Sequence, residues 1–355
     1  MSKKTYLHVD FNNMFHRMKH MSVKGSSVDE QIGLVIHQML TGIKSAWDRF
    51  DASHVIVELE GKSWRKQVSP DYKMNRVAQR LKRKPSEIEM DEEFQKVAND
   101  FQNYLKRYTN CTVVSSKNAE ADDVIATFIF DHPDKNHIIV SSDKDFHQLI
   151  SSNVCIFDAM KGEIVTHQGV FDDRMKPVID KNTKKQKQIG DPEWILFKKC
   201  FRGDPSDNIF SAYPRVREKG TKNTVGLQEA FNDRHSKGYE WNTVMMHEWT
   251  DADGNKRLVK DEYEFNKILI DLRLIPDFVK EQIREDLTKE MIREVKTNEI
   301  GFHFLKFCKK YDLQAIIRSS SYYLDFLGKK APEDDVEKEK ELAQQTTLVE
   351  NNDDA

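Results

Sequence analysis

The chain has 355 residues, of which 38% are hydrophobic, and this is enough to build a sizeable core in one or two domains. No stretch approaches the roughly 20 consecutive apolar residues that span a bilayer, and the N-terminus lacks the apolar region of a signal peptide. The four cysteines form no C-x-x-C pair, so the sequence indicates neither a zinc site nor a disulfide framework. We therefore expect a cytoplasmic protein that makes no membrane contact.

Charge is distributed unevenly along the chain. The formal net charge is −3, but residues 329–355 carry −5, so the rest of the chain carries +2. Residues 62–84 hold nine Lys or Arg against a single acid, a net charge of +8. Such a density of cations is typical of a surface that contacts nucleic-acid phosphates. The tail at residues 329–355 is rich in Glu, Asp, Asn and Gln, and we expect it to be disordered.

Strand-like and helix-like segments alternate through the first 200 residues. Apolar runs rich in β-formers predict strands at residues 6–9, 54–57, 112–114, 137–140 and 154–157. Segments of helical period lie between or after them, at residues 28–47, 90–108, 121–130 and 146–150. This alternation predicts an α/β domain over residues 1–200, with a mostly parallel central sheet and helices on both faces.

The second part of the chain has a different pattern. Residues 201–328 contain mainly segments of helical period and predict a helical C-terminal region. Two polar stretches interrupt the regular pattern. Residues 174–188 are lysine-rich, and residues 249–260 indicate a turn or a hairpin.

Acidic residues follow the predicted strands at several points. Asp10 ends the first strand, Glu58 ends the second, and the fourth strand is followed by a pair of acids. The carboxyl ends of parallel strands meet at one edge of the sheet, where such proteins carry out their chemistry. The pair after the fourth strand is Asp143 and Asp145. The other acids of the set are Glu120, Asp122 and Asp123 at a predicted helix start, and Asp204 and Asp207 in RGDPSDNI.

Carboxylates brought together at this edge require a counter-charge. At about 5 Å apart, each like-charged pair costs about 3 kcal/mol at an effective dielectric constant of about 20. Oxygen ligands without His or Cys select hard divalent cations, here Mg²⁺ or Mn²⁺. Two such ions, about 4 Å apart, activate a water molecule and stabilise the transition state of phosphodiester hydrolysis. The acids therefore predict a two-ion magnesium site that transfers a phosphoryl group to water.

Five sequence blocks, in their order and spacing, resemble the signature motifs of the 5′ nuclease family, which includes flap endonucleases and the 5′ nuclease domain of bacterial DNA polymerase I. They are HVDFNN, VELEGKSWRKQVSPDYKMNR, AEADDVIA, SSDKDFHQL and RGDPSDNI. A further segment, YEFNKILIDLRLIPDFV, is similar to the ribonuclease H branch of this family in T-even phages. The resemblance implies a PIN-like nuclease fold and a DNA-binding role for the helical region 201–328.

The resemblance also assigns the acids to two metal sites. The first falls to Asp10, Glu58, Glu120, Asp122, Asp143 and Asp145, with Asp123 nearby. The second falls to Asp145, Asp204 and Asp207. The family usually has Asp where this chain has Glu58, and Glu60 is the neighbouring alternative. A second departure follows Asn208, where many members have a glycine-rich turn with a potassium site and this chain has a different sequence.

The basic segment at residues 62–84, which we call the basic arch, corresponds to the family segment through which a single-stranded 5′ end reaches the metal ions. Lys73 and Arg76 match its basic positions, and they are the predicted catalytic cations that neutralise the scissile phosphate. Trp64 and Tyr72 are either packing residues or platforms for a frayed base. The predicted nucleic-acid contacts are Arg65, Lys66, Lys73, Arg76, Arg80, Lys82, Arg83 and Lys84.

Together these features predict a monomeric, Mg²⁺-dependent 5′ nuclease that removes 5′ flaps or RNA primers during phage DNA replication or repair. A sliding clamp or a single-strand-binding protein is a further candidate partner. The apolar cluster of Leu324, Phe326 and Leu327 either docks on such a clamp or caps the helical region. Two alternatives stay open, a PIN-type ribonuclease and a non-catalytic DNA-binding accessory of replication.

Overall fold

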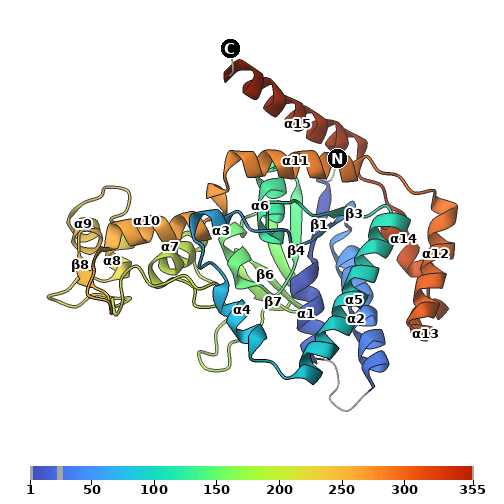
Figure 1. The fold of residues 1–355 in the computed structure, drawn as a ribbon, viewed down its shortest axis with the longest axis horizontal. Helices are drawn as coiled ribbons and strands as arrows, with labels where there is room; N and C mark the ends of the chain where they lie inside the picture. The colour runs from blue at the N-terminus through green and yellow to red at the C-terminus, as the bar shows by residue number, and fades with distance from the viewer. Residues whose placement is uncertain (1–2, 22–26, 354–355) are drawn as a thin grey trace. The chain divides into compact units, whose positions relative to one another are not determined.

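The computed structural model describes residues 3–21 and 27–353 (Figure 1). The chain forms two compact units, and each unit is assembled from segments that are distant in sequence. Unit one comprises residues 1–63, 84–189 and 276–355, and unit two comprises residues 64–83 and 190–275. Within the described residues, no helix is both long enough and apolar enough to cross a membrane.

Unit one is built on a seven-stranded sheet with the order β3-β2-β1-β4-β5-β6-β7. The strands from β3 to β5 are parallel, and β6 and β7 extend the sheet from β5 as an antiparallel hairpin. All five predicted strands are present, and the mostly parallel sheet is confirmed; the sequence did not predict the hairpin. The strands are β1 (Thr5–Asp10), β2 (His54–Glu58), β3 (Thr112–Val114), β4 (Asn136–Val140), β5 (Val154–Asp158), β6 (Glu163–Thr166) and β7 (Gly169–Phe171).

Helices cover both faces of this sheet (Figure 1). Alternate residues of β1 face opposite sides, as the pleat of a strand requires. Leu7 and Val9 join the large core beneath one set of helices, whereas Tyr6 and His8 pack edge-on against Phe128 on the other side. The first set is α1 (Phe11–Met21), α2 (Val28–Phe50) and α5 (Pro85–Tyr108), and the second set is α6 (Ala121–Asp131) and α11 (Asp277–Met291).

The C-terminal helices belong to unit one and not to a separate helical region, which corrects the expected division at residues 201–328. Phe326 and Leu327 are 1% and 0% exposed and lie in the same core as α2 and α5. Their burial supports the alternative that this cluster caps the helical layer, and docking on a clamp stays an untested prediction. These helices are α12 (Thr297–Lys310), α13 (Gln314–Arg318) and α14 (Ser321–Gly328).

The acidic tail is also more ordered than its composition predicts, because residues Glu333–Asp353 form helix α15 beside α11 (Figure 1). Asp335 is 2% exposed, accepts a hydrogen bond from the Tyr6 hydroxyl, and pairs with Lys135 at 3.0 Å. Lys338 Nζ donates to the carbonyl oxygen of Asp131 at 2.6 Å. Specific ion pairs at the start of the helix thus supply the contacts that a tail of low hydrophobicity was expected to lack.

Unit two is mainly helical and contains residues 64–83 of the basic arch. The rings of Phe197, Phe201, Phe231 and Tyr263 pack against one another at tilted angles in its core. The short strands β8 (Glu248–Thr250) and β9 (Lys256–Leu258) pair antiparallel, which confirms the predicted hairpin. The helices are α3 (Arg65–Val68), α4 (Met74–Leu81), α7 (Pro192–Arg202), α8 (Leu227–Asn232), α9 (Tyr239–Met245) and α10 (Val259–Ile270), followed by the 3-10 turn η2 (Leu272–Leu274).

Candidate active site

Asp10, the last residue of β1, belongs to the acidic group in unit one, and β1 lies between β2 and β4 in the sheet. Its carboxylate accepts hydrogen bonds from the Asn13 backbone amide at 3.2 Å and from the Ser141 hydroxyl at 2.9 Å. Burial raises the pKa of Asp10 to about 7, and the nearby carboxylates of Asp143 and Glu60 add to this rise. The negative potential at this carboxylate is what a bound divalent cation would relieve.

Glu60 is held beside the start of α6 by the loop that follows β2. Its Oε2 accepts a hydrogen bond from the Ala121 amide at 3.1 Å. The next residue, Gly61, donates from its amide to the Ala119 carbonyl at 3.0 Å, and a Cβ at this position would lie 1.9 Å from the Ser116 carbonyl oxygen. Only glycine permits this close approach, so the Glu-Gly pair fixes the position of the Glu60 carboxylate.

Three acids at the N-terminus of α6 form a compact group, in which one oxygen of each carboxylate lies within 4.8 Å of the others. Asp123 accepts a hydrogen bond from the Glu120 amide at 3.0 Å, and Asp122 accepts one from the Asp123 amide at 2.9 Å. Helix N-termini favour negative charge because their amides point outward. The helix therefore holds Glu120, Asp122 and Asp123 close together, as their sequence positions predict.

Asp143 and Asp145 follow β4 and begin the short 3-10 helix η1 (Lys144–Leu149). The Asp143 amide donates to the Ser141 hydroxyl at 3.1 Å, and the Asp143 carboxylate accepts from the Asp145 amide at 2.9 Å. Ser141 donates in turn to Asp10, so a chain of hydrogen bonds joins the ends of β1 and β4. Both acids are partly exposed, and their carboxylates are accessible to a ligand.

Glu58 does not join these acids, in contrast to its predicted role as a metal ligand. Its side chain is completely buried, and its Oε1 lies 2.7 Å from His8 Nδ1. Burial raises the pKa of Glu58 well above its usual range and lowers that of His8 to about 3, so the two form a neutral hydrogen-bonded pair. The position beside Asp10 and α6 is held by Glu60, which the sequence offered only as a neighbouring alternative.

The acids of unit one fit a hard divalent cation. Their donor atoms are carboxylate oxygens, which Mg²⁺ and Mn²⁺ prefer. The histidines of β1 and β2, His8 and His54, are buried in the sheet. The carboxylates of Glu60 and Asp143 both raise the pKa of Asp10. A cation of high charge density at this edge would stabilise the ionised form of Asp10.

Two more predicted ligands lie in the loop after α7, in unit two. Lys199 pairs with Asp204 at 2.8 Å, and Ser206 donates to the same carboxylate from its amide at 2.8 Å and from its hydroxyl at 2.6 Å. Partial burial opposes ionisation of Asp204, but the hydrogen bonds from Lys199 and Ser206 outweigh it and lower the pKa to about 2. Asp204 is therefore ionised at neutral pH.

Asp207 anchors the base of the basic arch within unit two. Its carboxylate accepts hydrogen bonds from Arg76 at 2.5 Å and from the Tyr72 hydroxyl at 3.2 Å, and Lys73 Nζ lies 3.9 Å away. The Lys73 amide also donates to the Asp207 carbonyl oxygen at 2.9 Å. The structure thus brings both predicted catalytic cations, Lys73 and Arg76, to one of the predicted ligands.

The remaining arch residues divide into buried and exposed groups. Arg65 is 1% exposed, and its Nε donates to the Leu269 carbonyl at 2.8 Å, so this buried guanidinium does not fit the predicted nucleic-acid contact. Trp64 and Tyr72 are 2% and 3% exposed, and the structure supports packing over base stacking for both. The predicted contacts that do face solvent are Lys66, Arg76, Arg80, Lys82, Arg83 and Lys84.

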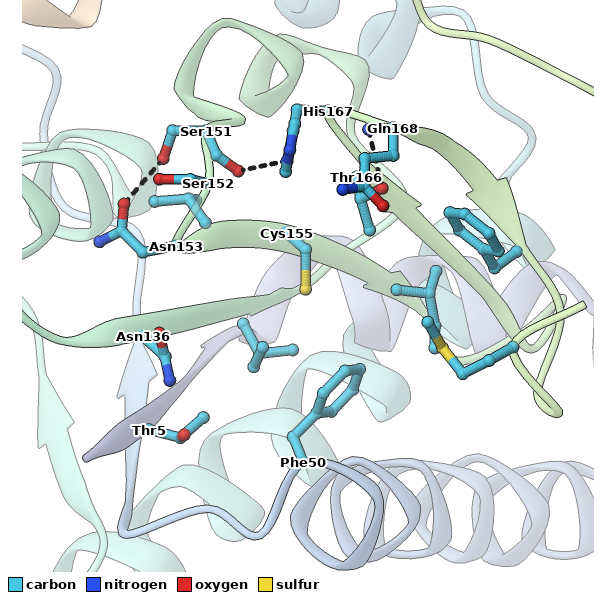
Figure 2. Close-up of a pocket in the computed structure, with 15 residues that line it drawn as sticks. Thr5, Phe50, Asn136, Ser151, Ser152, Asn153, Cys155, Thr166, His167 and Gln168 are labelled. Atoms are coloured by element: carbon cyan, nitrogen blue, oxygen red, sulfur yellow. Dashed lines mark hydrogen bonds between the residues drawn. The ribbon is translucent and has the colours of Figure 1, made fainter. Parts of the chain in front are cut away.

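A cavity of about 320 Å³ lies elsewhere in unit one. Figure 2 shows the residues that line it. Thr5, Asn136 and Val154 line it at the amino-terminal ends of β1, β4 and β5, which is the edge of the sheet opposite to Asp10. None of the described residues that line this cavity is acidic. It is therefore no candidate for the metal centre.

The sequence matches a known family over the region that carries the acids of unit one. Residues 5–175 match the model of the 5′-3′ exonuclease N-terminal, resolvase-like domain. A 5′-3′ exonuclease of Mycoplasmopsis pulmonis (strain UAB CTIP) is 30% identical over 237 residues, which are 65% of this chain and 70% of that protein. Flap endonuclease Xni of Pseudoalteromonas translucida (strain TAC 125) is 26% identical over 192 residues, covering 51% of this chain and 63% of its own.

Solved structures share the fold. The flap endonuclease of bacteriophage T5, crystallised with DNA and metal ions, is similar with a TM-score of 0.53 and 18% identity, over 82% of this chain and 100% of that chain. The T5 5′-exonuclease with bound zinc gives a TM-score of 0.54 at 18% identity, over 81% of this chain and 99% of that chain. The sheet order, the acids at its edge and the extent of the match to the Mycoplasmopsis relative lead to one conclusion: the chain belongs to the 5′-3′ exonuclease family of nucleases.

Proposed function

We propose that this chain is a Mg²⁺-dependent, structure-specific 5′ nuclease that acts on DNA as a 5′→3′ exonuclease and flap endonuclease. The observation that carries the proposal is that Glu60 and Asp143 lie close enough to Asp10, at one edge of the sheet, to raise its pKa. A group of like charges is costly without a cation, and carboxylates of this kind favour Mg²⁺, with Mn²⁺ as a substitute. Family membership supports hydrolysis of a phosphodiester bond as the reaction.

The acids of unit one are the proposed ligands of the metal. Asp10, Glu60 and Asp143 form the centre of the set, and the group at the start of α6 supplies Glu120 and Asp122. Bound ions of this kind lower the pKa of a water molecule and stabilise the charge that develops on the phosphate. Asp123 and Asp145 complete the set in unit one, and Asp204 and Asp207 stay predicted ligands of a second ion.

The cations of the basic arch have a complementary role in the proposal. Lys73 and Arg76 are held by Asp207 at the base of the arch, and this fixes the positions of their charged ends. Donors held in place before the reaction stabilise a phosphate that gains negative charge in the transition state. The exposed cations further along, Arg80, Lys82, Arg83 and Lys84, neutralise phosphates of the incoming strand.

The biological substrate is proposed from resemblance in sequence. The likeness of YEFNKILIDLRLIPDFV to the T-even phage ribonuclease H branch favours removal of RNA primers, or of 5′ flaps, during phage DNA replication or repair. The flap endonucleases among the relatives and the DNA-bound T5 structure favour a DNA substrate with a free 5′ end.

A titration of Mg²⁺ against cleavage of a labelled 5′-flap DNA tests the proposal. We expect no cleavage in EDTA and saturable cleavage near the base of the flap as Mg²⁺ rises. Cleavage of single-stranded RNA in preference to the flap would support a PIN-type ribonuclease instead. Binding of the flap without cleavage at any Mg²⁺ or Mn²⁺ concentration would support the non-catalytic DNA-binding accessory.

A further inference from the structure

The lysine-rich stretch predicted at residues 174–188 forms an ordered extension of the sheet, at residues 172–187, which we call the lysine ribbon. Residues Phe171 and Pro177 form an antiparallel bridge, as do Ile179 and Gln186. The Val178 amide donates to the Val170 carbonyl at 2.9 Å, and the Lys187 amide donates to the Val178 carbonyl at 2.8 Å. Residues 177–180 and 185–187 are therefore two adjacent antiparallel segments that continue outward from β7.

The ribbon starts at the edge of the sheet that carries the acids. β6 is antiparallel to β5, and β7 is antiparallel to β6, so β7 runs in the same direction as β1 and β4. The carboxyl end of β7 is therefore at the same edge as Asp10 and Asp143. The first turn of the ribbon, residues 172–176, follows directly from this end.

Six cations of the ribbon face solvent. They are Arg174, Lys176, Lys181, Lys184, Lys185 and Lys187. Lys187 pairs with Glu163 at 3.0 Å, whereas in the described part of the chain the other five have no carboxylate within ion-pair distance. The turn at residues 172–176 also contains Asp172 and Asp173 and has no net charge, so the exposed positive charge comes mainly from the turn at residues 181–185.

Two acids of the ribbon are occupied by its own backbone. Asp172 Oδ1 accepts hydrogen bonds from the amides of Arg174 and Lys176, both at 2.8 Å. Asp180 Oδ1 accepts from the amides of Asn182 and Thr183 at 3.0 and 2.8 Å. These bonds fix the shape of both turns.

We propose that the lysine ribbon is a second nucleic-acid contact of this chain, one that binds the phosphates of double-stranded DNA without reading its sequence. A two-stranded ribbon matches the width of the major groove, about 12 Å, and lysines are suited to phosphates on both sides of a groove. The turns are held by internal hydrogen bonds, so little order has to be gained on binding. The contact rests on the proposed function only in that the substrate contains duplex DNA.

The ribbon contact is tested by salt-dependent binding of a blunt DNA duplex without a flap, measured in EDTA so that cleavage does not contribute. The variant is Lys181→Ala/Lys184→Ala/Lys185→Ala. Each phosphate neutralised on a duplex contributes about −0.9 to the slope of log K against log salt. We expect the slope to be less steep by roughly 2 to 3 in the variant than in the wild type. At low salt the variant should bind the duplex at least about tenfold more weakly.

A matched control removes three exposed lysines from another part of unit one, in Lys296→Ala/Lys306→Ala/Lys309→Ala at and along α12. The control should keep the wild-type slope, and both variants should keep the wild-type melting temperature. The proposal is overturned if the ribbon variant has the wild-type slope, or if its slope changes no more than the slope of the control variant does. A loss confined to single-stranded DNA also overturns it. Because this assay needs no catalysis, failure of Mg²⁺-dependent cleavage would be seen separately.

Discussion

The carboxyl oxygen Oε1 of Glu58 lies 2.7 Å from Nδ1 of His8, in the interior of the sheet where neither side chain is exposed. His8 Nε2 in turn lies 3.1 Å from His137 Nδ1, so the polar contacts of Glu58 run into the core. Glu60, two residues further along, points toward the start of α6 and is exposed. The two glutamates of VELEG therefore differ in position: Glu58 is a buried residue of the sheet, and Glu60 lies with the other acids at the edge of the sheet.

The first prediction compares these two glutamates. Glu60→Gln should lower the single-turnover rate on a 5′ flap by roughly 10² or more, because a neutral amide is a poorer ligand for Mg²⁺ than a carboxylate. Glu58→Gln should keep most of the wild-type rate, because Glu58 is already neutral in its contact with His8. Both rates are measured at saturating Mg²⁺ with enzyme in excess.

Melting curves serve as the control for this pair, since Glu58→Gln changes a buried hydrogen bond and is expected to affect stability more than Glu60→Gln does. If Glu58→Gln lost as much rate as Glu60→Gln while melting like the wild type, the exclusion of Glu58 from the metal site would be wrong.

The sequence predicted most of unit one but not the choice between these glutamates. Strand alternation and apolar runs locate β1 to β5 because each strand is buried on both faces, and acids that end such strands stand out. Whether Glu58 or Glu60 faces the other acids depends on the loop after β2. That loop is fixed by the close approach of Gly61 to the Ser116 carbonyl, a contact between segments far apart in sequence.

The second prediction concerns the cations at the base of the arch. Lys73→Ala and Arg76→Ala should each lower the single-turnover rate by roughly 10², about 3 kcal/mol, with a smaller effect on DNA affinity. Arg80→Ala, on the exposed face of the same helix α4, is the matched control and should mainly weaken binding. Equal losses of affinity for all three variants, with unchanged rates at saturation, would assign Lys73 and Arg76 to strand binding alone.

The third prediction is a pH dependence in the docking of α15. Glu339 and His132 are both buried, with 3.5 Å between Glu339 Oε1 and His132 Nε2. Burial, with the charge of Asp131, raises the pKa of Glu339 to about 8, and burial lowers that of His132 to about 4. A raised carboxyl pKa gives the folded state more bound protons than the unfolded state, so stability falls as pH rises toward 8.

The lowered pKa of His132 has the opposite effect, but only below its unfolded value of about 6.5. Between about pH 6.5 and 8 the Glu339 effect is therefore dominant, and docking should weaken by at most about 1.4 kcal/mol per pH unit. Hydrogen exchange of the amides at residues 335–343 measures it. Glu339→Gln should flatten the dependence, and an equally steep dependence in that variant would contradict the assignment to Glu339.

The fourth prediction follows from the burial of Phe326. Phe326→Ala should destabilise unit one by about 3 to 5 kcal/mol, because it leaves a cavity between α14 and α2. Thermal unfolding measures this loss, and Tyr322→Ala, a change at an exposed aromatic on the same helix, is the control. An unaltered melting temperature for Phe326→Ala would mean that the side chain is free to act at the surface.

Local sequence patterns could predict neither the division into two units nor the ordered tail. Residues 276–328 have the helical period of a separate region, yet Phe304 and Phe326 pack into the core that also holds Leu7. The pairing of Asp335 with Tyr6 and Lys135 links residues about 200 to 330 positions apart, and composition alone cannot predict such contacts. Helical periodicity shows which face of a helix is apolar, but it does not show which distant segment of the chain packs against that face.

The central claim is that the acids at the carboxyl edge of the sheet serve metal ions in catalysis, and Asp143→Asn tests it most directly. The measurement is the single-turnover rate on a labelled 5′ flap at saturating Mg²⁺, together with flap binding in EDTA and the melting temperature. The account predicts that flap binding and folding persist while the rate falls below about a hundredth of the wild-type value. A variant that retains more than about a tenth of the wild-type rate would contradict it.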